Sequence, residues 1–115
     1  MEKEGKIDTI IGKETMLNGN LKTNGSIRID GSVQGDIEVK ESLFAGKGSL
    51  IKGNINCKSA VIGGKIEGNI IASELLEFQS GAQITGDITC RGLIIQSGVI
   101  FDGTCQMSQK SKEKG

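Results

Sequence analysis

The side chains in this sequence that could carry chemistry are three cysteines and a set of carboxylates. The cysteines, Cys57, Cys90 and Cys105, lack the C-x-x-C spacing of metal sites, and the sequence contains no histidine. Without histidine, neither the base of hexapeptide acyltransferases nor the ligands of the related zinc carbonic anhydrases can be supplied. Paired carboxylates, as in polysaccharide lyases and hydrolases, are the remaining catalytic option. The acids that could serve are Asp36, Asp87 and Asp102.

All three acids lie in a five-residue pattern that occurs six times, Asp36 and Asp87 at its fourth position and Asp102 at its second. The pattern reads apolar, polar, Gly, Asp/Asn/Thr, apolar, and its copies are residues 17–21, 33–37, 51–55, 66–70, 84–88 and 101–105. We call each copy a pentad. Because the acids at the fourth position alternate with Asn and Thr, turn chemistry explains them better than catalysis does. The sequence therefore predicts no enzyme, with no catalytic, cofactor-binding or metal-binding residues.

The spacing of the pentads predicts the fold. Their central glycines, at 19, 35, 53, 68, 86 and 103, are separated by 16, 18, 15, 18 and 17 residues. A period near 17 is too short for two helices and a turn, but it accommodates three short strands. We therefore predict an all-β, single-domain parallel β-helix of about six coils. Variable coil lengths favour a right-handed helix over the strict six-residue repeat of left-handed ones.

The predicted β-helix covers residues 9–107, between a polar tail at 1–8 and a lysine-rich tail at 108–115. Both short tails are expected to be disordered. In each pentad the apolar residues and the glycine are predicted to face inward, and the Asp, Asn or Thr to bond a neighbouring coil. All three cysteines are predicted to be buried, with Cys57 and Cys90 about 10 Å apart and beyond disulfide reach.

A second strand in each coil alternates inward and outward residues, at 27–29, 43–45, 60–62, 76–78 and 93–95. The outer residues of each triplet are predicted to face the core. The middle residues, which face outward, are Arg28, Phe44, Val61, Glu77 and Ile94. Three of these five are apolar. Phe44, Val61 and Ile94 thus form either an ordinary exposed stripe or a surface that binds a partner.

The ends of a solenoid require cover, because a bare coil exposes unpaired backbone groups over an open core. Both tails here are polar, so the sequence predicts that the ends associate with other copies of the chain. Two-fold contacts at both ends would build a non-polar filament, and head-to-tail contacts a polar one. The sequence does not choose between them. The alternative function is a non-polymerising binding module that docks a partner on the exposed apolar column.

Charge and hydropathy indicate which partners the protein can bind and where in the cell it is located. Fourteen basic and 14 acidic residues balance, so no field favours nucleic acid. No apolar run approaches the roughly 18 residues of a membrane span, and no export signal precedes the repeats. We therefore expect a cytoplasmic protein.

Three segments resemble the bactofilins: residues 9–12, 25–35 and 98–107, in particular the run Ile-Arg-Ile-Asp-Gly and the closing phenylalanine and cysteine. The resemblance implies a bacterial cytoskeletal protein that polymerises end to end, without nucleotide, into non-polar filaments. Such filaments scaffold cell-shape, envelope or motility machinery, often on the inner membrane. Residues 1–6 depart from the family's membrane-binding members, which begin with a short apolar segment. Direct membrane binding is therefore not expected, and envelope, cell-wall or motility proteins are the expected recruiting partners.

The resemblance also implies that Phe101, in its Gly-x-x-Phe-x-Gly-x-Cys setting, is needed for polymerisation. The residues predicted to form the contact at the carboxyl end are Phe101, Ile100, Cys105 and Met107. Those predicted to form the contact at the amino end are Ile10, Ile11, Met16 and Leu17.

Overall fold

The structure, a computed structural model, describes residues 7–107. Residues 1–6 and 108–115, and with them most of the two predicted tails, lie outside the described residues. The first strand begins at Ile7, inside the segment that the sequence assigns to the tail. The strands of the described part are β1 (Ile7–Ile11), β2 (Met16–Asn18), β3 (Leu21–Thr23), β4 (Ser26–Ile29), β5 (Ser32–Gln34), β6 (Ile37–Val39), β7 (Ser42–Ala45), β8 (Leu50–Lys52), β9 (Ile55–Ile62), β10 (Lys65–Glu67), β11 (Ile70–Phe78), β12 (Gln83–Cys90), β13 (Gly92–Ile95) and β14 (Ile100–Met107).

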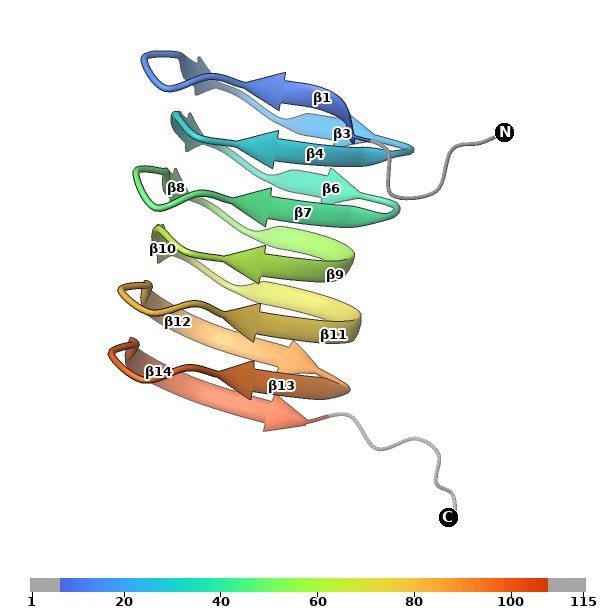
Figure 1. Cartoon of the computed structure of the whole chain (residues 1–115). Coiled ribbons are helices and arrows are strands. Elements are labelled where there is room, and N and C mark those ends of the chain that lie inside the picture. Colours follow the sequence, from blue (N-terminus) through green and yellow to red (C-terminus); the bar gives the residue numbers. More distant parts are fainter. Residues whose placement is uncertain (1–6, 108–115) are drawn as a thin grey trace.

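These strands wind into a parallel β-helix of about six coils, as predicted. One face consists of β1, β4, β7, β9, β11 and β13, each pairing in parallel with the next. We call it the near sheet, because it faces the viewer in Figure 1. The near strands run from right to left, and the chain returns behind them while it descends, so the helix is right-handed (Figure 1).

The other two faces start from the pentads. One follows β2, β5, β8, β10, β12 and β14, and the other follows β3, β6, β9, β11, β12 and β14. Four strands are long enough to serve two faces each: β9 and β11 bend from one face to the next, and β12 and β14 each contain a whole pentad. The register aligns the pentads as the sequence predicts, with Gly86 opposite Gly103 and Ile84 opposite Phe101.

The core is a set of stacked apolar columns. In the near sheet the outer residues of the triplets are buried from Ile27 to Phe78, which confirms their predicted direction. In the pentads the apolar pairs are buried from Val33 to Ile88. The last coil differs, because no described residue covers its outer side. Ile95 is 49% exposed there, whereas Phe78, its neighbour in the preceding coil, is fully buried.

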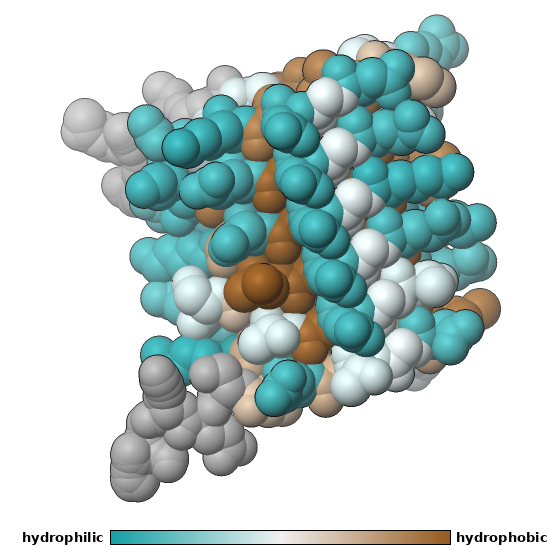
Figure 2. Space-filling model, turned by 180° about the vertical axis from the view of Figure 1, so that it is seen from behind, coloured by the Kyte–Doolittle hydropathy of each residue, from teal (hydrophilic) through white to brown (hydrophobic). Residues whose placement is uncertain are grey.

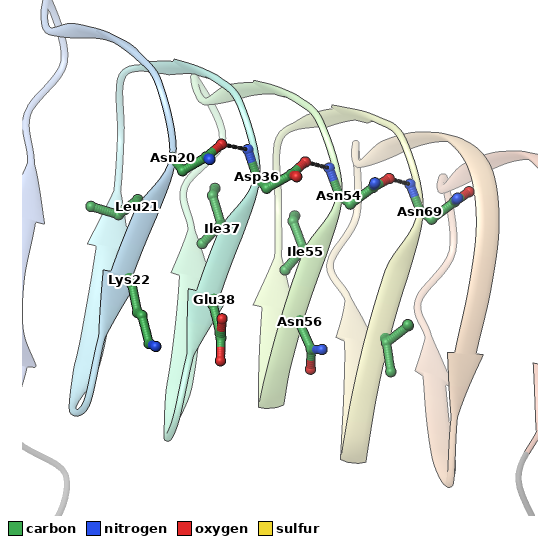
Figure 3. A pocket seen from close by; sticks show the side chains of 11 residues that line it. Asn20, Leu21, Lys22, Asp36, Ile37, Glu38, Asn54, Ile55, Asn56 and Asn69 are labelled. Atoms are coloured by element: carbon green, nitrogen blue, oxygen red, sulfur yellow. Dashed lines mark hydrogen bonds between the residues drawn. The ribbon is translucent and has the colours of Figure 1, made fainter.

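In the first four pentads the Asn or Asp after the glycine bonds the following coil, as predicted. Its side-chain oxygen accepts a hydrogen bond from the backbone N–H of its counterpart one coil later. Asn20 accepts from Asp36 at 3.1 Å, Asp36 from Asn54 at 3.2 Å and Asn54 from Asn69 at 3.3 Å (Figure 3). Asn69 in turn accepts from Asp87 at 3.2 Å. We call this row the amide ladder. Asp36 is thus a structural acceptor, which agrees with the turn-chemistry interpretation.

The pentad glycines do not face the core, which corrects the sequence prediction. Each has a positive φ, for example +149° at Gly53, and points toward the preceding coil. A Cβ on Gly53 would overlap the carbonyl oxygen of Gly35, and the same clash recurs from Gly35 to Gly103. Glycine is required here because the backbones of adjacent coils touch, and because the positive φ disfavours any side chain.

Coils differ in length because their corners are of two kinds, long and short. Long corners contain a turn closed by a backbone hydrogen bond, such as Ser49 N–H to the Gly46 carbonyl at 3.1 Å. Short corners use Gly31 and Gly64, whose hypothetical Cβ atoms would overlap the turn of the neighbouring coil. The sheets therefore stay in register although the repeats are unequal.

The cysteines follow the prediction only in part. Cys57 and Cys90 are buried in the same column, whereas Cys105 is exposed. The prediction that Cys105 is buried was wrong because it treated the last coil like the others, and no further coil among residues 7–107 covers it.

Replacing a pentad glycine should destabilise the fold. We expect Gly53→Ala to lower the free energy of unfolding by about 2–3 kcal/mol, since it combines a strained φ with a backbone clash. Gly48→Ala is the matched control, because a Cβ there meets no atom within 4 Å. It should change stability by no more than about 0.5 kcal/mol. Urea denaturation followed by circular dichroism measures both, and equal midpoints would contradict the stacking argument.

The Cys57 thiol should resist alkylation in the native protein. Burial raises its pKa from 9.0 to about 12, so at pH 8 the reactive thiolate is about 1,000-fold scarcer than in the unfolded chain. Iodoacetamide labelling, mapped by mass spectrometry, should modify Cys57 at least about 100-fold more slowly in the native protein than in urea. Fast native labelling of Cys57 would place its column on the surface.

Candidate functional site

The carboxyl-terminal coil, formed by β13 and β14, ends in an apolar surface. Its inward residues stack on the coil below: Ile95 on Phe78, Phe101 on Ile84, and Met107 on Cys90. Beyond them lies no described residue, and Met107 and Ile95 are 41% and 49% exposed. We call this surface the carboxyl end face. No strand of the described part pairs with the outer edges of β13 and β14, so these edges can continue the backbone ladder.

Phe101 lies at the centre of the carboxyl end face. It is half-buried, packs against the core, and its ring centroid lies 6.5 Å from that of Phe78 at an interplanar angle of 32°. This geometry leaves one side of the ring against the protein and the other available for a contact. An aromatic side chain of this size offers a large apolar area at a low cost in conformational entropy.

Three sulfur atoms gather between the last two coils. Cys90 Sγ lies 3.7 Å from Met107 Sδ, and Cys105 contacts the Cys90 thiol from the same coil as Met107. The pKa of Cys90 is raised, first by burial and then by the charge and the hydrogen bond of Cys105. A raised pKa keeps Cys90 a neutral thiol at physiological pH, which suits packing rather than nucleophilic chemistry. The described residues contain no group of three or more His, Cys, Asp and Glu side chains placed to bind a metal ion.

The amino-terminal coil presents a second apolar surface, the amino end face. Ile11 is nearly buried, and Leu17 and Leu21 are half-buried against the core. They lead the inward columns that continue through Ile29, Val33 and Ile37. No described residue covers the outer side of Leu17 or Leu21.

The structure divides the predicted contact residues into two groups. At the carboxyl end it brings together Phe101, Cys105 and Met107, and at the amino end Ile11 and Leu17. Three others point sideways from the solenoid: Ile10, Met16 and Ile100, which are 66%, 67% and 59% exposed. Strand alternation explains the split, since Ile100 precedes inward Phe101 and Met16 precedes inward Leu17.

Sequence reasoning missed other members of the carboxyl end face. Leu93, Ile95 and Val99 belong to the last coil and lie half-buried or exposed beside Phe101. The signal was present in the triplet at 93–95, which was assigned to the core without asking what covers it.

The predicted partner stripe also has a defined place. Phe44 and Val61 are half-buried and Ile94 is 45% exposed, all on the outward side of the near sheet. Arg28 and Glu77 belong to the same column. The stripe is therefore continuous from coil to coil, but it is interrupted by charge.

A groove of about 520 Å³ runs along the opposite side of the molecule. The amide ladder forms one wall, Lys22, Glu38, Asn56 and Ile71 form the other, and Leu21, Ile37 and Ile55 lie along the floor (Figure 3). Figure 2 shows this arrangement as a hydrophilic column beside an apolar one. The ladder oxygens of Asn20, Asp36 and Asn54 already accept backbone hydrogen bonds, so they have a structural use that needs no ligand.

Within the described residues there is no helix long and apolar enough to cross a membrane.

Comparisons with known proteins point in one direction. The profile of the bactofilin family, described as polymer-forming cytoskeletal, matches residues 9–106. The fold is similar to a Thermus thermophilus bactofilin solved by cryo-electron microscopy as double helical filaments, with a TM-score of 0.83 and 26% identity over 87% of this chain and 99% of that one. It is also similar to the cytoskeletal bactofilin BacA, whose atomic structure comes from solid-state NMR, with a TM-score of 0.80 and 24% identity over 91% of this chain and 100% of that one.

A search of curated proteins found no match. The family profile nevertheless spans nearly all of the solenoid, and the resemblance noted in the sequence is thereby confirmed. This chain belongs to the bactofilin family of polymer-forming cytoskeletal proteins.

Proposed function

We propose that this protein polymerises end to end, without nucleotide, into non-polar filaments in which carboxyl end faces meet each other and amino end faces meet each other. The filaments serve as a cytoplasmic scaffold for cell-shape, envelope or motility machinery. Partner proteins of the envelope, cell wall or motility apparatus bring them to the inner face of the membrane. The chain itself is proposed to need no cofactor, metal or nucleic acid.

The observation that carries this proposal is the state of the two end coils. Each has apolar columns that stop without cover among the described residues, led by Leu17 at one end and Phe101 at the other. Each also has strand edges that pair on one side only. Association through the ends satisfies both deficits at once, because it buries the apolar surface and supplies hydrogen-bond partners.

Assembly without nucleotide follows from the same contact between end faces. Burying the end faces is favourable in itself, so assembly needs no hydrolysis to drive it. Support for filaments also comes from the Thermus thermophilus bactofilin, which was solved as filaments. Negative-stain electron microscopy of the purified chain, with a chelator and without nucleotide, should show filaments. Dispersed monomers would instead favour the binding-module alternative.

Two pairs of neighbouring residues test the end contacts. Phe101→Arg and Leu17→Arg place a charge on an end face, where desolvation costs several kcal/mol, on the order of 3 or more, if the contact forms. Ile100→Arg and Met16→Arg place the same charge one residue away, on outward side chains. We expect the first pair to abolish filaments with a near-parental β spectrum, and the second pair to leave them unchanged.

Two results for Phe101→Arg would contradict the proposed role of this residue. Filaments of normal length would remove Phe101 from the interface. Global unfolding would show that Phe101 serves only to close the core of the monomer, and Met107→Lys, at an already exposed position, would then test the same face without that risk.

Mixing the two blocked variants distinguishes non-polar from polar filaments. In a non-polar filament Phe101→Arg retains its amino contact and Leu17→Arg its carboxyl contact, so each variant alone forms dimers. In a polar filament each variant alone is a monomer, and only the mixture forms dimers. We expect dimers of each separate variant by analytical ultracentrifugation. Monomers that dimerise only on mixing would overturn the non-polar arrangement but not polymerisation.

A further inference from the structure

The near sheet has one outward residue per coil in a single column, fixed by the strand register. The column reads Ile10, Arg28, Phe44, Val61, Glu77 and Ile94 from the first coil to the last. We call it the outward column. The near sheet that carries the outward column faces the viewer in Figure 1.

The order of residues in the outward column is complementary to itself when reversed. Reversal places Ile10 opposite Ile94, Arg28 opposite Glu77, and Phe44 opposite Val61. Every apolar residue then meets an apolar one, and each charge meets its opposite. A two-fold axis parallel to the strands, passing between the third and fourth coils, produces this superposition between two copies placed face to face.

We infer that the outward column is a lateral contact through which two copies of this chain lie side by side in opposite directions. The occupant of the stripe is thus a second copy, carried by a neighbouring filament, and not an unrelated protein. The inference rests on the proposed function to the extent that it takes filaments as given.

The opposite, parallel arrangement is disfavoured by the same residues. It would set Arg28 against Arg28 and Glu77 against Glu77 across the contact. Like charges facing each other in a partly desolvated contact repel each other. Charge therefore selects one relative direction from the two that the shape of a flat sheet allows.

The neighbours of the column differ on its two sides. In the two central coils the flanking positions are Ser42 and Ser59 on one side and Gly46 and Gly63 on the other. The serines are small, whereas the side chain of Asp30 lies against Gly46 and that of Gln79 against Gly63. A second copy can therefore approach Phe44 and Val61 most closely over the serine side of the column.

Arg28 and Glu77 each have a bond within the chain, yet both can make another. Arg28 Nε donates to Asp30 Oδ2 at 3.0 Å, while its side chain stays 49% exposed. Glu77 Oε2 accepts from Gln96 Nε2 at 3.3 Å. A guanidinium has five N–H donors and a carboxylate about four acceptor sites, so these bonds orient the two groups without saturating them.

The size of the contact explains why it should depend on filaments. Six positions at about 4.8 Å per coil make a stripe roughly 24 Å long, well short of the ~800 Å² per partner of a stable complex even if it is 10–15 Å wide. A single pair of subunits is therefore too weak to associate. Repetition along two filaments multiplies the contact, because every later pair forms at a high effective concentration.

The arrangement is compatible with the filament proposed above. In a non-polar filament successive subunits point in alternating directions. Each subunit can thus face an oppositely directed one in a neighbouring filament.

Charge reversal and charge exchange test the inference in the full chain. We expect wild-type filaments to be paired in negative-stain or cryo-electron microscopy at low ionic strength. Arg28→Glu and Glu77→Arg each create two repulsive contacts per pair of subunits, so paired filaments should fall at least about tenfold while single filaments persist. The double variant Arg28→Glu/Glu77→Arg should restore pairing. Lys52→Glu and Glu38→Arg are controls, because they make the same charge changes on the other two faces.

Mixing adds a second positive result. Filaments grown separately from Arg28→Glu and from Glu77→Arg should pair with each other, since each charge again faces its opposite. Wild-type filaments that remain single, or reversed variants that remain paired, would overturn the lateral contact and leave the proposed function intact. Failure of the double variant to pair, with both controls paired, would also overturn it. Complete loss of filaments in the wild type would refute the proposed function and the inference together.

Discussion

Backbone hydrogen bonding from coil to coil is the constraint on which the rest of this structure depends. Gly35 N–H donates to Lys52, Gly53 to Glu67 and Gly68 to Thr85, each at 2.9 Å, so neighbouring coils are as close as parallel strands can be. At that spacing the pentad corner has no room for a Cβ. The same bonds make every coil depend on a neighbour on both sides. Each end coil has such a neighbour on one side only among the described residues, so its outer backbone groups lack these hydrogen bonds.

Much of the fold could be predicted because the pentad recurs in register. Its apolar pairs and its Asp, Asn or Thr have the predicted directions, from Val33 to Ile88 and from Asn20 to Asp87. The direction of the glycine could not be predicted in this way. Both an inward glycine and one stacked on the preceding coil give the same sequence pattern. Only the distance between backbones distinguishes them, and that distance is a property of the stacked coils, not of one repeat.

The candidate site was predicted less well, for two different reasons. Ile100 and Phe101 were grouped together although they are adjacent in a strand, and alternation alone would have separated them. Cys105 and Ile95 are different, because their own residues carry no signal of exposure. They look like the buried members of their columns and are exposed only because the column ends there. Their exposure depends on which coil they belong to. A repeat pattern does not contain this information, because it describes every coil in the same way.

The ends and the sides of this solenoid offer contacts of unequal strength. An end face carries unpaired backbone edges together with an apolar cross-section, so covering it gains hydrogen bonds and buried area at once. On the near sheet every interior strand already pairs on both sides, and only side chains such as Phe44 and Arg28 remain for a contact. Association through the ends should therefore precede association through the sides. The charges that interrupt the outward column then have a physical use: they weaken pairing of single subunits, while they set its direction once repetition has made it strong enough.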